Sequence, residues 1–388
     1  MLEIYELPLA VLAQLGPNVR LDPRTFILMF SVFLALLIAY VIGRTLRRQP
    51  ESTASPAVVQ TFNQRVLAWA IMFGILIVGL IPQGRWGYIL TMVLFALVSF
   101  WALREFITMT PTRRGDHLTL FFTLVVFTPL QYVFVGLGRG YYGLYTVMIP
   151  VYASLLIPSM IAVSGDPKRF LERAAKIQAG LMICVYCLSH APAILDLDLT
   201  TSRGGQPWYI NEPSPTAQVP VSPAGAPTAK TQAAAASPPQ PSGSPRPGVR
   251  GSNASLLFFF ILIVQLNDVF QYMWSQLRGK RVIAPLINAS RTWEGLIGGV
   301  LSTTAVGMLL LWATPFGFWA GPIAGVVALA GFAGSMTMSG IKRDRNVKDY
   351  GTLVSGHAGV LDRIDSLCFA APVFFHITRY FFTGVPDS

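Results

Sequence analysis

Charged residues are scarce in this chain of 388 residues: Asp, Glu, Lys and Arg make up 12% of it, against 53% hydrophobic residues. Soluble globular domains carry about 25% charged residues, so the deficit excludes a soluble globule. The mean hydropathy of +0.53 indicates an integral membrane protein. Cysteine is also rare, and three cysteines do not make a disulfide framework. The first ten residues lack Lys and Arg, so we expect no cleaved signal peptide, which needs a basic start.

Long apolar stretches separated by short polar loops account for most of the chain. A helix needs about 20 mainly apolar residues to cross a bilayer, and about ten stretches approach that length. We therefore predict an all-α polytopic membrane protein with about ten transmembrane helices. The expected spans are 26–43, 66–83, 88–103, 118–137, 144–164, 177–194, 255–274, 296–313, 320–338 and 366–383.

Basic residues are unevenly distributed among the loops between these spans. Of the 29 Lys and Arg residues, about 20 follow the first, third, fifth, seventh and ninth spans, and loops rich in Lys and Arg face the cytoplasm. We therefore expect both termini outside and the polar motifs inside. The expected location is a bacterial inner membrane, with an active site that faces the cytoplasm.

The composition divides the chain into three parts. Residues 1–194 contain the N-terminal transmembrane helices, and residues 255–388 form a C-terminal transmembrane region with the polar motifs. Between them, residues 195–254 are rich in Pro, Ala and Ser, with ten prolines between 212 and 248. Such a segment cannot bury enough apolar surface to offset the entropy of ordering it. We predict a disordered external loop.

Polar chemistry is concentrated in residues 339–365, which read SGIKRDRNVKDYGTLVSGHAGVLDRID. Asp362 and Asp365 are three positions apart, so on a helix they share a face, as paired metal-binding carboxylates would. Glycines on both sides of His357 would let the backbone approach a ligand closely. Positive charge that suits a polyphosphate comes from Lys342, Arg343, Arg345 and Lys348. The alternative is a basic loop held at the inner membrane face.

A second polar group interrupts the seventh apolar span. Asn267 and Asp268 lie about two turns before its inner end. An ionisable residue at that depth is costly, so it indicates a functional site that faces the bundle or a water-filled pocket. Gln271 and Tyr272 follow three and four residues after Asp268, on the same helix face. The alternative is a polar pair that holds helices together.

The order of these residues resembles the signature of the phosphatidate cytidylyltransferases, the CDP-diacylglycerol synthases. That signature has Ser, two residues, Lys-Arg, four residues and Lys-Asp, then a Gly-rich His turn that ends in Asp-Arg-x-Asp. The positions in register are Ser339, Lys342-Arg343, Lys348-Asp349, Gly356-His357, Gly359 and Asp362-Arg363-Ile364-Asp365. Upstream matches are Asp268, Tyr272, Gly279-Lys280, Pro285, Thr292 and Gly295. The resemblance covers residues 255–380, whereas the earlier helices match only in being hydrophobic.

The chain departs from this pattern at several polar positions. Ser335 stands where the family usually has an aspartate that helps to hold metal, and Arg291 stands where a lysine is usual. In the His turn, Ser355 and Ala358 replace a proline and a glycine. Hard cations select anionic oxygen ligands, so the loss of one carboxylate weakens cation binding. The resemblance therefore implies the fold more directly than it implies ordinary activity.

The function implied by the resemblance is transfer of a cytidylyl group from CTP to phosphatidate, giving CDP-diacylglycerol and pyrophosphate in phospholipid biosynthesis. The expected cofactor is Mg²⁺, with a second cation left open, and the expected partners are CTP, phosphatidate and membrane lipid, without nucleic acid. A homodimer is also left open.

The resemblance assigns the site residues to three roles. The metal ligands would be Asp268, Asp362, Asp365 and Ser335. The catalytic group would contain Asp362, Asp365, Lys342, Arg343, Lys348 and Asp349. Substrate would be bound by Ser339, Lys280, Arg291, Thr292, His357, Arg363, Asn267 and Tyr272. Two alternatives stay open: a degenerate or altered-substrate relative that binds nucleotide or anionic lipid, and an ion-coupled transporter.

Overall fold

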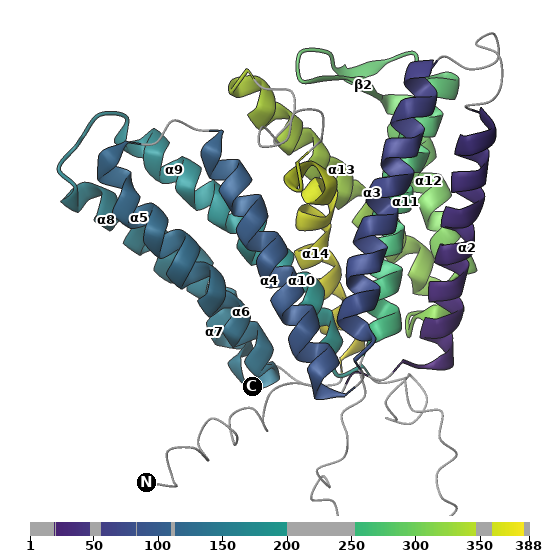
Figure 1. Cartoon of the computed structure of the whole chain (residues 1–388), viewed down its shortest axis with the longest axis horizontal. Helices are drawn as coiled ribbons and strands as arrows, with labels where there is room; N and C mark the ends of the chain where they lie inside the picture. The colour runs from purple at the N-terminus through teal and green to yellow at the C-terminus, as the bar shows by residue number, and fades with distance from the viewer. Residues whose placement is uncertain are drawn as a thin grey trace, which may run out of the picture.

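The computed structural model describes residues 19, 21–46, 56–82, 84–109, 113–199, 253–346 and 359–383. Within these ranges the chain is a bundle of helices with one short β-hairpin (Figure 1). The helices are α2 (Pro23–Leu46), α3 (Pro56–Leu80), α4 (Arg85–Thr108), α5 (His117–Phe121), α6 (Thr128–Leu137), α7 (Tyr142–Val147), α8 (Ser154–Val163), α9 (Phe170–Leu181), α10 (Leu188–Ala193), α11 (Ala254–Arg278), α12 (Trp293–Leu309), α13 (Ala320–Asp344) and α14 (Leu361–Phe382). The strands are β1 (Val282–Ala284) and β2 (Asn288–Thr292).

Several of these helices join into longer rods. Short π-helical segments at 122–127, 148–153 and 182–187 connect α5 to α6, α7 to α8 and α9 to α10. Among the described residues, six helical segments are long and apolar enough to cross a membrane: Arg85–Thr108, His117–Leu137, Tyr142–Val163, Phe170–Asp196, Ala254–Arg278 and Gly317–Asp344. This finding supports an integral membrane protein. Each of the predicted spans corresponds to a helical rod, but the count of about ten crossings stays a prediction.

The described residues are mostly helical, in agreement with the predicted all-α class, and residues 282–292 are a local departure from helix. These residues form an antiparallel hairpin in which Val282 pairs with Thr292 and Ala284 with Asn288. The carboxylate of Glu294 accepts the backbone N–H groups of Lys280 and Arg281, each at 3.2 Å, and so fixes the chain as it enters the hairpin. These strands are too short and too mixed in polarity to produce a clear alternating pattern.

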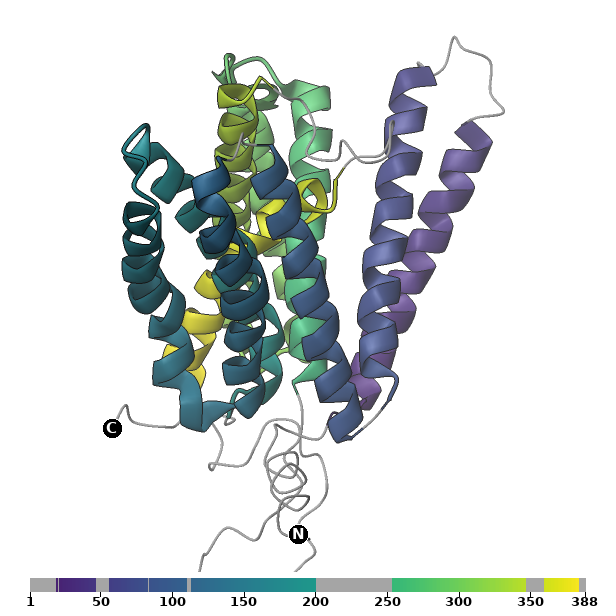
Figure 2. The ribbon, with the colours of Figure 1, turned by 60° about the vertical axis from the view of Figure 1, so that its left-hand side comes forward.

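Helices α11, α12, α13 and α14 pack side by side, and α14 also contacts α10 and α4. The stacked rings of Phe260 and Phe374, 4.9 Å apart, join α11 to α14. On the other side of α14, the ring of Phe375 lies 5.3 Å from that of His190 on α10. The C-terminal helix therefore connects the two halves of the chain, while α2 and α3 stand at one edge of the bundle (Figure 2).

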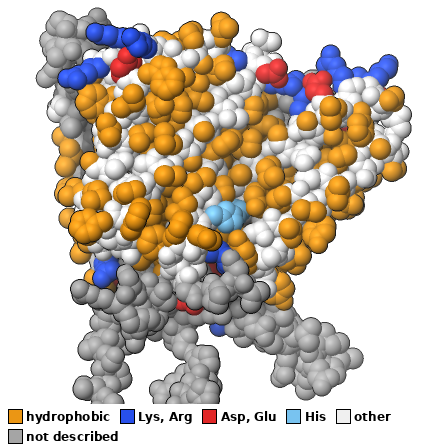
Figure 3. Space-filling view, turned by 180° about the vertical axis from the view of Figure 1, so that it is seen from behind, with side chains coloured by type: hydrophobic (Ala, Val, Ile, Leu, Met, Phe, Trp, Pro, Cys, Tyr) orange, Lys and Arg blue, Asp and Glu red, His pale blue; other side chains and the backbone are white. Residues whose placement is uncertain are grey.

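The two ends of the bundle differ in charge. Lys and Arg side chains gather along one end, the upper edge in Figure 3, above a broad hydrophobic belt. The hairpin lies at that end in Figure 1. Leu199 pairs with Thr383, and the amide of Asn253 donates to the carbonyls of Ile194 and Leu197 at 3.2 and 2.7 Å. Leu199 and Asn253, the described residues on either side of the long loop, therefore lie in neighbouring parts of the bundle. The predicted disorder of the intervening loop falls outside the described residues.

The charge asymmetry predicts that the long loop and the hairpin face opposite sides of the membrane. We expect cysteines introduced at Ala226 and at Leu286, in a variant whose native cysteines are replaced by serine, to react with a membrane-impermeant maleimide from opposite sides. Leu286 is a suitable reporter because 92% of it is exposed. Labelling of both cysteines from the same side in oriented vesicles would contradict the topology.

Candidate active site

The polar pair in α11 divides between two roles. Asn267 is fully buried, and its amide donates to the carbonyl of Ala328 on α13 at 3.0 Å. Its carbonyl oxygen accepts the amide of Gln271 at 3.1 Å. The contact with Ala328 holds α11 against α13, as the helix-joining alternative expects, and the contact of Asn267 with substrate stays a prediction. Asp268, the next residue along the helix, is partly exposed and faces a different set of neighbours.

Asp268 and Asp365 lie on either side of one hydroxyl group. The Ser366 Oγ lies 2.7 Å from Asp268 Oδ2 and 3.3 Å from Asp365 Oδ1. A hydroxyl carries one hydrogen, so it donates to only one of these carboxylates at a time. The backbone N–H of Ser366 also donates to Asp365 Oδ1, at 2.7 Å, and helps to fix the orientation of this carboxylate. The result is an acidic pair with a shared hydroxyl, formed by α11 and α14.

Arg291 completes this cluster from the hairpin. Its Nη2 lies 3.2 Å from Asp268 Oδ1 and 2.7 Å from the Oγ of Ser335 on α13. Its Nη1 donates to Gln271 Oε1 at 2.5 Å. The fold therefore brings together four residues that the sequence singled out: Asp268, Arg291, Ser335 and Asp365. Gln271 and Ser366 were not assigned roles from the sequence, although the spacing already placed Gln271 on the face of Asp268.

Asp362 has a different partner from Asp365. Its Oδ1 lies 2.7 Å from the Nζ of Lys342 at the end of α13. This ion pair is largely buried, with 16% of the lysine side chain and 10% of the aspartate side chain exposed. The sequence spacing predicts that the two aspartates of the signature share a helix face, as paired metal-binding carboxylates would. In the structure Asp365 faces Asp268, and Asp362 faces Lys342.

The remaining predicted residues lie in three kinds of place: on the surface around the cluster, which is called the rim here, at a helix cap, or outside the described residues. Arg343 is exposed and donates through Nε to the carbonyl of Ile287 at 3.2 Å. Thr292 caps α12 by accepting the N–H of Gly295 at 3.0 Å, so its position serves the helix. The other described rim and nearby positions are Ser339, which accepts from Asn288 at 3.1 Å, the exposed Lys280 and the half-buried Tyr272. Outside the described residues lie Lys348, Asp349 and His357.

The acidic pair is suited to one hard cation. Carboxylate and hydroxyl oxygens are the ligands that Mg²⁺ prefers, and Asp268, Asp365 and Ser366 present such oxygens close together. The described part of the chain holds no group of three or more His, Cys, Asp or Glu side chains placed around a metal. The donors present are two carboxylates and one hydroxyl, a set that suits one divalent ion.

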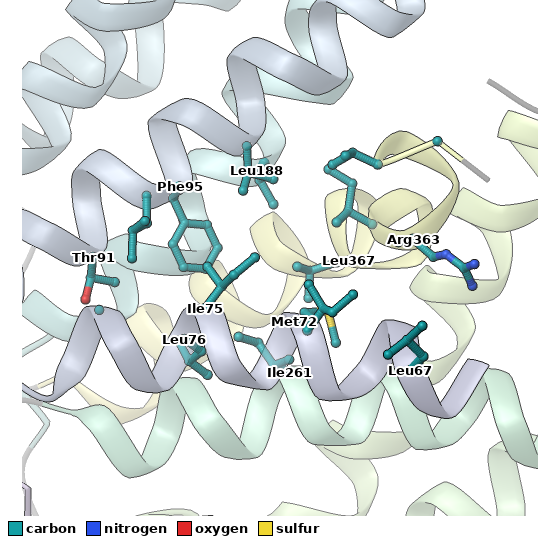
Figure 4. Close-up of a pocket in the computed structure, with 17 residues that line it drawn as sticks. Leu67, Met72, Ile75, Leu76, Thr91, Phe95, Leu188, Ile261, Arg363 and Leu367 are labelled. Carbon is teal, nitrogen blue, oxygen red and sulfur yellow. The ribbon is translucent and has the colours of Figure 1, made fainter. Parts of the chain in front are cut away.

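An apolar cavity of about 360 Å³ borders the first turns of α14, the helix that carries Asp362 and Asp365. It lies between α3 and α4 and is also lined by residues of α10, α11 and the start of α14. Figure 4 shows Arg363 at one end of the cavity and Thr91 at the other. On α3 its lining runs from Leu67 to Gly79, about 18 Å at 1.5 Å per residue. That length matches about half of a hydrocarbon core roughly 30 Å thick.

Glu105 on α4 anchors the helix that carries the aspartates. Its two carboxylate oxygens accept the backbone N–H groups of Val360 and Leu361 at 3.1 and 2.9 Å. One oxygen also accepts the indole N–H of Trp101 at 3.1 Å. A carboxylate at a helix N-terminus is stabilised by the helix dipole and by the otherwise unpaired N–H groups. Glu105 was not among the residues predicted from the sequence; the available signal was an acidic residue just after an apolar span.

The chain is similar in sequence to known proteins. Residues 63–381 match the sequence model of the Cytidylyltransferase family. The chain is 31% identical over 359 residues to the uncharacterized protein YnbB of Escherichia coli (strain K12), a match that covers 90% of this chain and 97% of that protein. It is 34% identical over 127 residues to the phosphatidate cytidylyltransferase of Staphylococcus aureus (strain COL), covering 32% of this chain and 49% of the relative. The chain therefore spans about half the length of that enzyme.

Proposed function

Because this chain belongs to the cytidylyltransferase family, we propose that it transfers a cytidylyl group from CTP to phosphatidate, giving CDP-diacylglycerol and pyrophosphate. One observation carries the proposal: the start of α14 borders both the acidic cluster and the apolar cavity. Asp365 faces Asp268, while Arg363 and Ile364 line the cavity. A lipid with its tails in the cavity would therefore present its phosphate beside the acidic cluster.

Charge neutralisation is the main requirement of this reaction. An oxygen of the phosphatidate phosphate attacks the α-phosphorus of CTP, and the bond from that phosphorus to the β-phosphate oxygen breaks to release pyrophosphate. Two anions must approach each other, so cationic groups around the phosphates contribute most of the rate increase. The phosphate nucleophile is already ionised near neutral pH, so the site needs no strong general base.

The described residues suggest a division of labour around these phosphates. Lys280 and Arg343 are exposed on the hairpin side and would bind the triphosphate, with Arg343 offering planar donors. Lys342 would hold Asp362 at the edge of the site. Asp268 and Asp365 would hold a Mg²⁺ ion, which when bound neutralises charge on phosphate oxygens. The site would face the cytoplasm of a bacterial inner membrane, where CTP is available.

Filling the cavity should weaken binding of the lipid without changing that of the nucleotide. We expect Ile75→Trp, which places an indole in the cavity lining, to raise the KM for phosphatidate about tenfold while the KM for CTP stays within about twofold. The matched control is Val78→Trp, on the same helix at a 54% exposed position outside the lining. Equal KM changes for both substrates, or an equal effect of the control, would contradict the assignment.

The direct test is an assay of purified protein in detergent with phosphatidate, radiolabelled CTP and Mg²⁺. We expect a CDP-lipid and one equivalent of pyrophosphate, and no product with phosphatidate omitted. Binding of CTP without any CDP-lipid would contradict transfer and support a relative that only binds nucleotide. Product from another phospholipid or nucleotide, but not from phosphatidate and CTP, would identify an altered-substrate enzyme.

A further inference from the structure

Arg291 is held inside the acidic cluster rather than at its rim. Only 16% of its side chain is exposed. Its guanidinium contacts an oxygen from each of three side chains: Asp268 and Gln271 on α11 and Ser335 on α13. These contacts use both terminal nitrogens of the group. The charge of an arginine is permanent in proteins, so the cluster contains a fixed cation in a defined position.

The guanidinium of Arg291 contacts only one of the two carboxylate oxygens of Asp268. Oδ1 faces Arg291 Nη2 at 3.2 Å, whereas Oδ2 accepts from Ser366 at 2.7 Å on the side of Asp365. A second positive ion beside Oδ1 would be repelled by the guanidinium a few ångströms away. A cation on the side of Oδ2 would instead bind between two carboxylates. Asp268 can therefore share a metal with Asp365 on only one side.

The two departures at Ser335 and Arg291 are in direct contact. The serine hydroxyl lies 2.7 Å from Arg291 Nη2. A carboxylate at position 335 would add a negative charge and one more ligand for a cation beside Asp268. Serine adds no charge, and its hydroxyl oxygen already accepts from the guanidinium of Arg291. A lysine has a single ammonium group and cannot span the same three acceptors in a fixed plane.

From this geometry we propose that Arg291 serves as a built-in cation, so that the site binds one divalent ion, between Asp268 and Asp365, instead of two. The inference rests on the proposed function in one respect: which ion the site uses during turnover. The number of bound ions is a property of the resting protein. It can be measured without CTP or lipid.

The test is the number of Mn²⁺ ions bound per chain, counted in detergent by electron paramagnetic resonance, which separates free from bound ion. We expect one ion for the wild type. Arg291→Met removes the charge and keeps much of the length, so it should tighten Mn²⁺ binding about tenfold. In Ser335→Asp/Arg291→Met the added carboxylate and the missing guanidinium should give a second bound ion. Ser335→Asp alone should keep one, because the guanidinium would pair with the new carboxylate.

Arg278→Met, at an exposed position at the end of α11, is the matched control for loss of an arginine and should leave Mn²⁺ binding unchanged. Two ions of similar affinity in the wild type would overturn the proposal, whatever the variants do. A double variant that folds, as judged by its thermal unfolding, and still binds one ion would also overturn it. A wild type that binds one Mn²⁺ but makes no CDP-lipid would leave this inference standing and reject the proposed function instead.

Discussion

Replacing Asp365 by asparagine should lower the rate of CDP-lipid formation at least about a hundredfold, which corresponds to about 2.7 kcal/mol of transition-state stabilisation. The substitution keeps the shape of the side chain and removes one of the two charges beside the Ser366 hydroxyl. A neutral amide binds a divalent cation much more weakly than a carboxylate does. The measurement is kcat in the detergent assay over a titration of Mg²⁺, because weaker ion binding also raises the Mg²⁺ concentration for half-maximal activity.

Two further variants test whether the loss of activity comes from the ion site formed by Asp268 and Asp365. Asp268→Asn should cause a similar loss, and the double variant should lose little more than either single one, because two ligands of one ion act as a unit. Asp344→Asn is the control on the neighbouring helix: its side chain is 68% exposed, and we expect its rate to stay within about twofold of the wild type. Unchanged turnover in both Asp268→Asn and Asp365→Asn would refute the metal assignment.

Glu105→Ala should destabilise the protein by about 2–4 kcal/mol, because it leaves the buried N–H of Leu361 and the partly buried N–H of Val360 at the start of α14 without an acceptor. The carboxylate is only 6% exposed, so water cannot easily replace it. Loosening this turn would also displace Asp362 and Asp365, and turnover should fall with stability. Thermal unfolding in detergent and CDP-lipid formation measure the two effects.

Two further variants test whether the effect of Glu105→Ala comes from the lost anchor of α14 or from the loss of an acidic side chain in general. Glu105→Gln keeps one acceptor oxygen and should lie between the wild type and the alanine variant in both stability and rate. Glu172→Ala removes an acidic side chain that is 37% exposed and pairs with Lys176 and Arg345, and exposed pairs contribute little. If Glu105→Ala unfolded at the wild-type temperature, the carboxylate would not be the anchor of α14.

The division between the two signature aspartates shows what periodicity can predict. Spacing of three residues correctly places Asp362 and Asp365 within the first turns of one helix. It does not say which element packs against each of them. The partner of Asp362 is Lys342, and the neighbour of Asp365 is Asp268 on α11. These partners depend on how three helices meet, which local patterns do not contain.

The sequence by itself determined the membrane class, the helical segments and the family, because each depends on composition or on the order of residues along the chain. Apolar length reflects bilayer thickness, and the signature is read residue by residue. The tertiary structure decided which polar groups meet: Arg291 with Ser335, and Glu105 with Val360, 255 positions later. Such contacts join helices from distant parts of the chain. Their geometry follows from the packing of whole helices, so no local pattern in the sequence specifies it.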